Sequence, residues 1–205
     1  MRAGRGQASG VAHQGTTGRL AQVISLRFAQ MESLLHGWEA TEQMLESGGF
    51  ESRQRVLVSE PAVEPSGIGA RRLGGTYWQA VAAVTRGGAR ATWGGRGGRL
   101  RVLGGATLLR FGSPELHHSD GVVSCGYPIE GGLLALRAGG SVTLAQRRDG
   151  DKHELSVTVE EYLPRLAARA RAPRWTGALY AKGQSPFHVA VSRRYFELLV
   201  RGRAA

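Results

Sequence analysis

The fold is decided by residues 121–164, GVVSCGYPIEGGLLALRAGGSVTLAQRRDGDKHELSVTVEEYLP. Within this stretch apolar and β-branched residues alternate with polar ones, and the runs are separated by glycines at 139–140 and by Asp-Gly-Asp at 149–151. Alternation with a period of two is typical of half-buried strands, and the Gly and Asp residues favour tight turns between them. The stretch therefore predicts a run of antiparallel strands.

The last two runs of this stretch indicate which side of the sheet is buried and which faces water. In residues 153–163 one face carries Leu155, Val157 and Val159 together with Glu161. The opposite face carries Glu154, Ser156, Thr158 and Glu160. In residues 141–148 Val142, Leu144 and Gln146 share a face. One side of the sheet is thus expected to be covered and the other to face water.

A helix over residues 186–200 supplies the expected cover. Ser185 is a suitable N-cap, and Pro186 suits the first helical position. Its apolar stripe is Phe187, Val191, Tyr195 and Leu198, widened by Phe196, Leu199 and Val200. The predicted fold class is therefore α+β: a curved antiparallel sheet of about six to seven strands with a C-terminal helix packed on it.

Several shorter elements are predicted ahead of this stretch. Strands are expected at 55–63, 89–93, 99–104, 107–111 and 115–118, with Gly-Gly-Arg-Gly-Gly at 94–98 as a hairpin turn. Residues 76–85 predict a short helix with Thr76 as its N-cap, and the glycine-rich residues 66–75 a connection.

The domain organisation is expected to be simple. Residues 1–19 lack bulky apolar side chains and predict a disordered segment. Residues 20–49 predict a helical extension, with apolar residues three and four apart. Residues 50–205 predict a single α+β domain. Met31 is an alternative start to Met1, so no function is placed on the first thirty residues.

The amino-acid composition indicates which binding partners and which cellular compartment to expect. The chain has 205 residues and a formal charge of +11. Nearly all its basic residues are arginines, as in proteins of GC-rich genomes. The excess of positive charge lies in residues 51–205, where the arginines are scattered. This scatter favours a solvated basic exterior over a nucleic-acid surface, although weak electrostatic nucleic-acid binding stays an alternative. Because no apolar run approaches about 18 residues and Cys125 is the sole cysteine, a soluble cytoplasmic protein without an internal disulfide is expected.

Motifs of catalysis or metal binding are weak. Residues 117–120, His-His-Ser-Asp, come closest to a metal cluster, but strand neighbours point to opposite faces, so a polar loop is expected. The same geometry argues against Glu160 and Glu161 acting as a carboxylate pair. Glycine-rich nucleotide-binding patterns do not follow a strand. No metal and no cofactor are expected.

The order of elements over residues 55–200 resembles the helix-grip fold of START-like and polyketide-cyclase-like proteins and of plant pathogenesis-related allergens. In that family a curved sheet wraps a long final helix, and a cavity between them holds a hydrophobic ligand. This sequence departs from the family in a short final helix of about fifteen residues and a weak first helical connection. The tail, residues 180–199, also resembles an uncharacterised bacterial family without a known activity.

The resemblance implies a ligand site between sheet and helix. Its polar end would be formed by His188 and Tyr195 with Tyr127 and Tyr162, and its apolar lining by Trp78, Trp93, Phe111, Phe187 and Tyr195. The leading hypothesis is binding or carriage of a small hydrophobic molecule. One alternative is an enzyme of cyclase, hydrolase or isomerase type that uses a His/Tyr acid–base pair, in which His188 or His153 would lie beside Tyr127 or Tyr162. The other is that these aromatic residues are simply core. The sequence indicates no oligomeric state.

Overall fold

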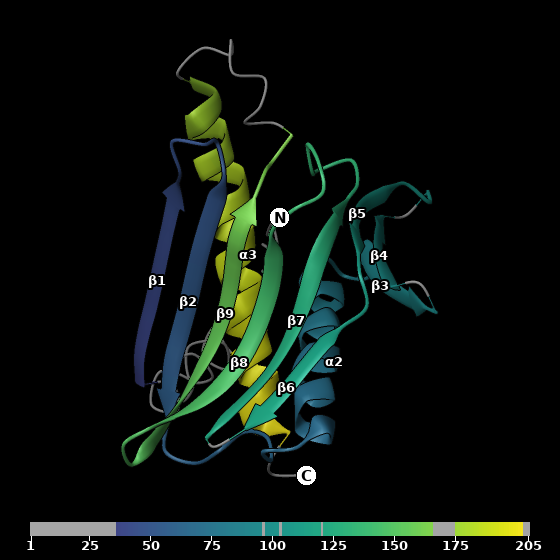
Figure 1. Cartoon of the computed structure of the whole chain (residues 1–205). Coiled ribbons are helices and arrows are strands. Elements are labelled where there is room, and N and C mark those ends of the chain that lie inside the picture. The colour runs from purple at the N-terminus through teal and green to yellow at the C-terminus, as the bar shows by residue number, and fades with distance from the viewer. Residues whose placement is uncertain (1–35, 96, 103, 120, 166–174, 203–205) are drawn as a thin grey trace, which may run out of the picture. The chain divides into compact units, whose positions relative to one another are not determined.

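A computed structural model of the chain describes residues 36–95, 97–102, 104–119, 121–165 and 175–202 (Figure 1). Its elements are β1 (His36–Met44), β2 (Phe50–Val58), α2 (Gly67–Val84), β3 (Ala89–Gly94), β4 (Gly97–Val102), β5 (Thr107–Phe111), β6 (Glu115–Ser119), β7 (Val122–Gly131), β8 (Ser141–Asp149), β9 (Lys152–Tyr162) and α3 (Trp175–Arg201). The segment expected to be disordered, residues 1–19, lies outside the described residues.

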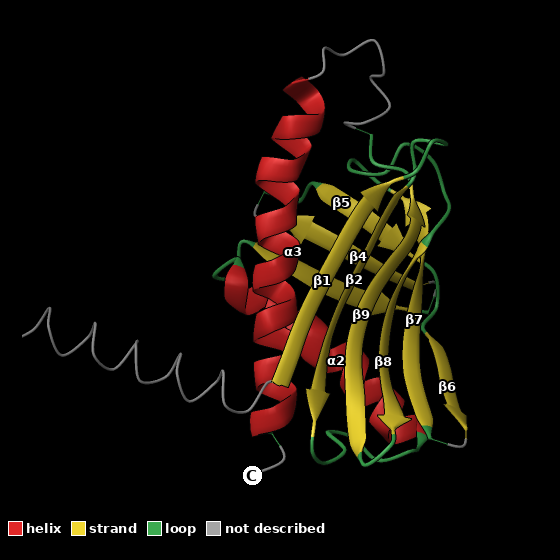
Figure 2. Cartoon of the chain, turned by 90° about the vertical axis from the view of Figure 1, so that its left-hand side faces the viewer, coloured by secondary structure: helices red, strands yellow, loops and turns green. Residues whose placement is uncertain are grey.

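The nine described strands form one antiparallel sheet. Their order is β1-β2-β9-β8-β7-β5-β4-β3, and β6 pairs with β7 beside this path. Both described helices lie against the same face of the sheet, and in Figure 2 the strands β3–β5 are turned steeply away from β1, β2 and β9. The α+β class, with the C-terminal helix on an antiparallel sheet, is confirmed; the described sheet has more strands than the six to seven expected.

The face assignment of β8 and β9 is confirmed in its main part. Val142, Leu144, Leu155, Val157 and Val159 are all buried under the helices. Their burial follows from the alternation of the two strands, which turns every second side chain toward the same side. This apolar face carries the core of the described domain.

Gln146 shares the inner face and has a distinct role there. Its Oε1 accepts hydrogen bonds from the backbone N–H groups of Ala62 and Val63 at 2.6 and 2.9 Å. Its Nε2 donates to the carbonyl of Val63 at 2.8 Å. The buried amide thus fixes the segment that leads from β2 into α2.

Glu161 departs from the expected alternation. It is exposed and has a positive φ of 50°. The register of β2 against β9 shifts here, from Ser52 opposite Val159 to Phe50 opposite Tyr162. Such a bulge adds one residue to a strand and reverses the faces beyond it. Tyr162 is therefore buried, while Glu161 faces outward.

Helix α2 is longer than the helix expected over residues 76–85 and includes most of the expected connection at 66–75. It begins after Ser66, whose Oγ accepts a hydrogen bond from the N–H of Gly69 at 3.1 Å, so the N-cap lies ten residues ahead of Thr76. The glycine-rich residues 66–75 were expected to be a connection because glycine disfavours helices. Here Gly69 and Gly74 serve close packing: a Cβ on either would collide with Glu64 or Tyr127.

The two ends of the described chain also differ from expectation. Residues 36–44, expected to be helical, form β1, which pairs along β2; the backbone hydrogen bonds of that pairing outweigh a helical pattern that is weak in this part. β2 itself begins at Phe50 and ends at Val58, ahead of the expected 55–63. Helix α3 has 27 residues, so the prediction of a short final helix over 186–200 is wrong. The length of the final helix is therefore no longer a difference from the helix-grip order of elements.

Candidate functional site

Four of the predicted site residues form a tight ring cluster between α2 and the sheet. Trp78 of α2 lies 5.1 Å from Phe111 of β5, 5.3 Å from Tyr127 of β7 and 5.7 Å from Trp93 of β3, measured between ring centroids. The rings of Trp93 and Tyr127 are 4.8 Å apart. Trp93 is 41% exposed and marks the edge of this inner aromatic cluster, while the other three are buried.

Tyr195 joins this cluster from α3. Its ring lies 5.7 Å from that of Tyr77, which in turn lies 5.1 Å from Trp78. Tyr195 is completely buried. The Tyr127 hydroxyl and the Cys125 thiol come up against α2 at Gly74, where a Cβ would touch both. Three phenol rings and a thiol thus meet where α2, α3 and β7 come together.

The ionisable groups here are held in their neutral forms. Burial raises the pKa of Tyr77 to about 12. Burial is also the largest cause that raises the pKa of Tyr127, Tyr195 and Cys125, because an anion would be poorly solvated there. At neutral pH these side chains therefore offer hydroxyl and thiol hydrogens.

Two buried polar atoms of this cluster have no hydrogen-bond partner among the described residues. They are the Trp78 Nε1 and the Tyr195 hydroxyl. Burial raises the pKa of Tyr127, and the nearby Trp78 indole opposes this rise without outweighing it, although the Trp78 N–H does not form a hydrogen bond with the Tyr127 hydroxyl. Buried polar groups in proteins are almost always hydrogen-bonded. Two buried donors in one aromatic cluster that have no partner among the described residues are therefore unusual.

The other predicted residues gather nearer the start of α3. The His188 ring stacks on Phe50 of β2 with 5.9 Å between centroids, and Phe50 is paired with Tyr162 across β2 and β9. Tyr162 donates its hydroxyl hydrogen to the carbonyl of Leu134 at 2.8 Å. Phe187 is 37% exposed, although it was expected in the helix's apolar stripe. The eight predicted residues therefore fall into two groups and not one.

His188 is the third unpartnered group. Its Nε2 is buried without a hydrogen-bond partner among the described residues, and burial lowers the pKa of the imidazole to about 4. The ring is thus neutral at pH 7. No hydrogen bond joins it to a described tyrosine, and the pKa values of Tyr162 and Tyr127 are raised by burial. Acid–base work at neutral pH favours groups with a pKa near 7.

A buried polar row links α3 to β2, and the sequence did not reveal it. Ser192 of α3 donates to Gln54 Oε1 at 2.9 Å, and Gln54 Nε2 donates to Ser52 Oγ at 2.6 Å. Ser52 and Gln54 alternate with arginines, so β2 is polar on both faces here and gives no sign of which is inward. The one signal in the sequence is that Ser52 and Gln54 lie an even number of residues from Phe50, Val56 and Val58, and so on the same face of the strand.

Other candidates from the sequence lie elsewhere. His117 and His118 are on β6 and exposed, and His117 Nε2 lies 3.0 Å from Ser119 Oγ. No group of three metal-ligating side chains occurs within the described ranges. His153 stands near the beginning of β9, at the opposite end of that strand from Tyr162. None of the described helices is both long and apolar enough to cross a bilayer.

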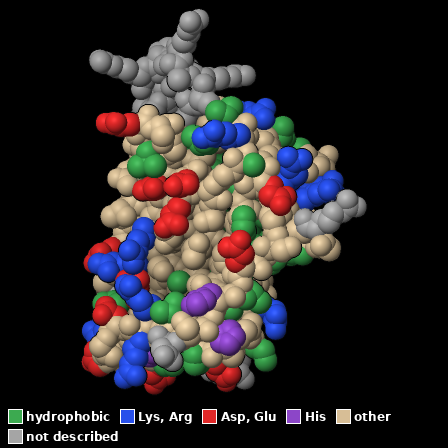
Figure 3. All heavy atoms as spheres, viewed as in Figure 1, with side chains coloured by type: hydrophobic (Ala, Val, Ile, Leu, Met, Phe, Trp, Pro, Cys, Tyr) green, Lys and Arg blue, Asp and Glu red, His purple; other side chains and the backbone are tan. Residues whose placement is uncertain are grey.

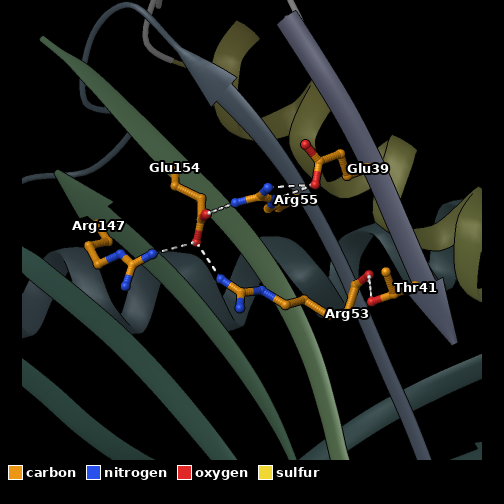
Figure 4. Close-up of polar contacts among 6 residues, drawn as sticks. All are labelled: Glu39, Thr41, Arg53, Arg55, Arg147 and Glu154. Carbon is orange, nitrogen blue, oxygen red and sulfur yellow. Dashed lines mark hydrogen bonds and ion pairs between the residues drawn. The ribbon is translucent and has the colours of Figure 1, made fainter. Parts of the chain in front are cut away.

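The outer face of the sheet carries an ionic network instead of a cluster of rings. Glu154 of β9 accepts from Arg53 and Arg55 of β2 at 2.9 and 3.0 Å, and lies 3.5 Å from Arg147 of β8 (Figure 4). Arg55 also donates to Glu39 of β1 at 2.8 Å. The Glu154 side chain is only 3% exposed because the arginines cover it.

Comparisons with known proteins add a distant structural likeness. No protein-family model matches the sequence, and a search of the curated proteins finds no match. Among solved structures, the solution NMR structure of CalU16 from Micromonospora echinospora is 12% identical, with a TM-score of 0.34 over 81% of this chain and 74% of that one. The crystal structure of CalU16 is 10% identical, with a TM-score of 0.34 over 81% of this chain and 84% of that one.

Proposed function

We propose that this protein binds a small, largely hydrophobic molecule between the inner face of its sheet and helices α2 and α3. The proposed ligand carries a hydrogen-bond acceptor, such as a carbonyl oxygen, at the end that faces Trp78 and Tyr195. Carriage or sensing of such a molecule is the corresponding role.

The proposal rests on two buried donors in an aromatic environment, the Trp78 N–H and the Tyr195 O–H, that have no partner among the described residues. An unsatisfied buried polar group costs about 1–3 kcal/mol. A bound molecule that supplies a hydrogen-bond acceptor to the Trp78 N–H and the Tyr195 O–H therefore lowers the free energy of the folded protein. The surrounding rings of Tyr77, Phe111 and Tyr127 provide the apolar contact that ligand sites of this kind use.

The enzyme alternative has less support. A histidine whose pKa is lowered to about 4 and tyrosines whose pKa values are raised by burial exchange protons poorly at neutral pH. The Nε2 atom of the partly exposed His188 is nevertheless buried beside Phe50 without a partner among the described residues, which suits a second polar contact for a bound molecule. Binding accounts for these groups without a proton-transfer step.

Native mass spectrometry of the purified protein tests the proposal. We expect an added mass of a few hundred daltons that is released under denaturing conditions, and a lower bound fraction in Tyr195→Phe. Loss of one hydrogen bond worth about 1 kcal/mol corresponds to a roughly fivefold weaker affinity.

Thr143→Val is the matched control, because Thr143 lies on the outer face of β8 and the substitution removes a hydroxyl there. Its bound fraction should equal that of the wild type. The proposal fails if the wild-type protein carries no added mass and no compound from a lipophilic cell extract raises its thermal midpoint. It also fails if Tyr195→Phe and Thr143→Val retain the ligand equally.

A further inference from the structure

Arginines face one another across β3, β4 and β5. Arg99 of β4 is directly opposite Arg110 of β5, and Arg90 of β3 is opposite Arg101 of β4. All four side chains are exposed, on the side of these strands that faces away from the inner aromatic cluster. Like charges directly opposite each other in a sheet are destabilising. Two such pairs side by side therefore need an explanation that stability does not supply.

Arg99 and Arg110 line an open depression of about 590 Å³. Arg137 and Arg165 line it as well, and Glu130 is its single carboxylate. None of these four arginines forms an ion pair within the described part of the chain; Arg110 only donates to the Glu130 carbonyl at 3.5 Å. Figure 3 shows basic side chains gathered over β4 and β5, at the right-hand edge of the molecule.

The chemistry of the lining matches a multiply charged oxyanion. Guanidinium groups present planar pairs of N–H donors that fit phosphate oxygens bidentately. An anion placed between Arg99 and Arg110 also turns a repulsive pair into two attractive contacts. We propose that this depression binds a small phosphorylated molecule that carries two or more negative charges, independently of the ligand proposed for the inner face.

A small ligand fits these observations better than a nucleic acid does. The depression has the volume of a small-molecule site, and Leu133 and Leu136 line it beside the arginines, with about half of each side chain exposed. Figure 3 shows acidic side chains on the neighbouring part of the same face, which a long polyanion would have to cross. A phosphate with an adjoining apolar part meets both kinds of lining residue.

Calorimetric titration with inorganic pyrophosphate tests this site in the full chain. The wild type should bind the probe, and Arg99→Gln/Arg110→Gln should weaken binding at least about tenfold, since each lost charge-assisted contact is strong. Without an anion the double variant should melt at the same temperature as the wild type or higher, because the like-charge pair is gone. That measurement also shows that the variant folds.

Arg71→Gln/Arg86→Gln is the control, since it removes the same charge from two exposed arginines on and just after α2. Its affinity for pyrophosphate should stay within about twofold of the wild type, because neither arginine lines the depression. Absence of pyrophosphate binding to the wild type overturns the proposal, as does an equal loss in both double variants. Retention on anionic lipid vesicles or on single-stranded DNA without pyrophosphate binding also overturns it.

Discussion

Gly74 sets how closely α2 approaches the sheet. A Cβ at this position would lie against the Tyr127 hydroxyl and only 2.9 Å from the Cys125 sulfur. Its neighbour Gly75 is exposed, and a Cβ added there would meet no atom within 4 Å, so it is free of this restraint. The absence of one side chain thus lets two polar groups of β7 press against α2 and reach the buried phenol cluster.

The two glycines make a matched pair of substitutions. Gly75→Ala should raise the free energy of unfolding by about 0.5–1 kcal/mol through helix propensity alone. Gly74→Ala gains the same propensity but must displace Tyr127, so a net loss of about 1–2 kcal/mol is expected. Urea denaturation of both variants measures the two signs, and equal effects would refute the close contact.

Some site residues were within reach of the sequence and others were not. Trp78, Phe111 and Tyr127 could be named because aromatic side chains on amphipathic elements are usually buried, and the structure brings them together. Tyr162 was named as well, but it reaches the inner face through a bulge that simple alternation does not reveal. Ser52 and Gln54 were missed because a buried polar row has no apolar periodicity.

At the scale of elements, Glu154 ties four strands together. Its carboxylate accepts hydrogen bonds from Arg53 and Arg55 of β2 and lies near Arg147 of β8. Arg55 also donates a hydrogen bond to Glu39 of β1. Burial by itself would raise the pKa of Glu154, but hydrogen bonds from Arg55 and Arg53 outweigh it, so the pKa is lowered. The charged form is therefore the one that the folded protein favours.

Glu154→Gln should make the stability of the protein depend less on pH. Because the pKa is lower in the folded state, the carboxylate contributes stability above its unfolded pKa and loses it as the pH falls through the folded value. At pH 7 the variant should lose about 1–2 kcal/mol, since the arginine partners are partly exposed. Below about pH 3 the difference from wild type should shrink toward zero.

Glu160→Gln is the control for this effect. Glu160 lies on the same face of β9, is exposed, and forms no ion pair within the described residues. Its substitution should change unfolding free energies little at any pH, as is usual for surface positions. A Glu154→Gln variant as stable as wild type at pH 7, or equally destabilised at pH 3, would contradict the network's role.

Elements were predicted well where local pattern and tertiary pairing agree. β5 has the expected bounds, and β7, β8 and β9 follow the alternation of residues 121–164 except at the bulge of β9 at Glu161. β1 was missed because an edge strand is stabilised by its partner β2, which its own sequence does not encode. The first half of α2 was missed because its glycines serve helix–sheet contact at the cost of helix propensity.

At the scale of the whole molecule, the two faces of the sheet differ in chemistry. The outer face carries ion pairs and, over β4 and β5, opposed arginines. The inner face carries aromatic rings, a buried polar row and three polar atoms, at Trp78, His188 and Tyr195, that have no hydrogen-bond partner in the described part of the chain. The Tyr195 hydroxyl has no hydrogen-bond partner among the described residues, and the central claim is that it is kept for a ligand.

The free energy of unfolding of ligand-free Tyr195→Phe tests this claim most directly, with Tyr162→Phe beside it. Tyr162 donates to Leu134, so losing its hydroxyl should cost about 1 kcal/mol. Tyr195 has no such partner among the described residues, so Tyr195→Phe should leave the protein, refolded after its ligand has been extracted, as stable as wild type or more so. A loss equal to that of Tyr162→Phe would show that the Tyr195 hydroxyl is already satisfied, and would contradict the account.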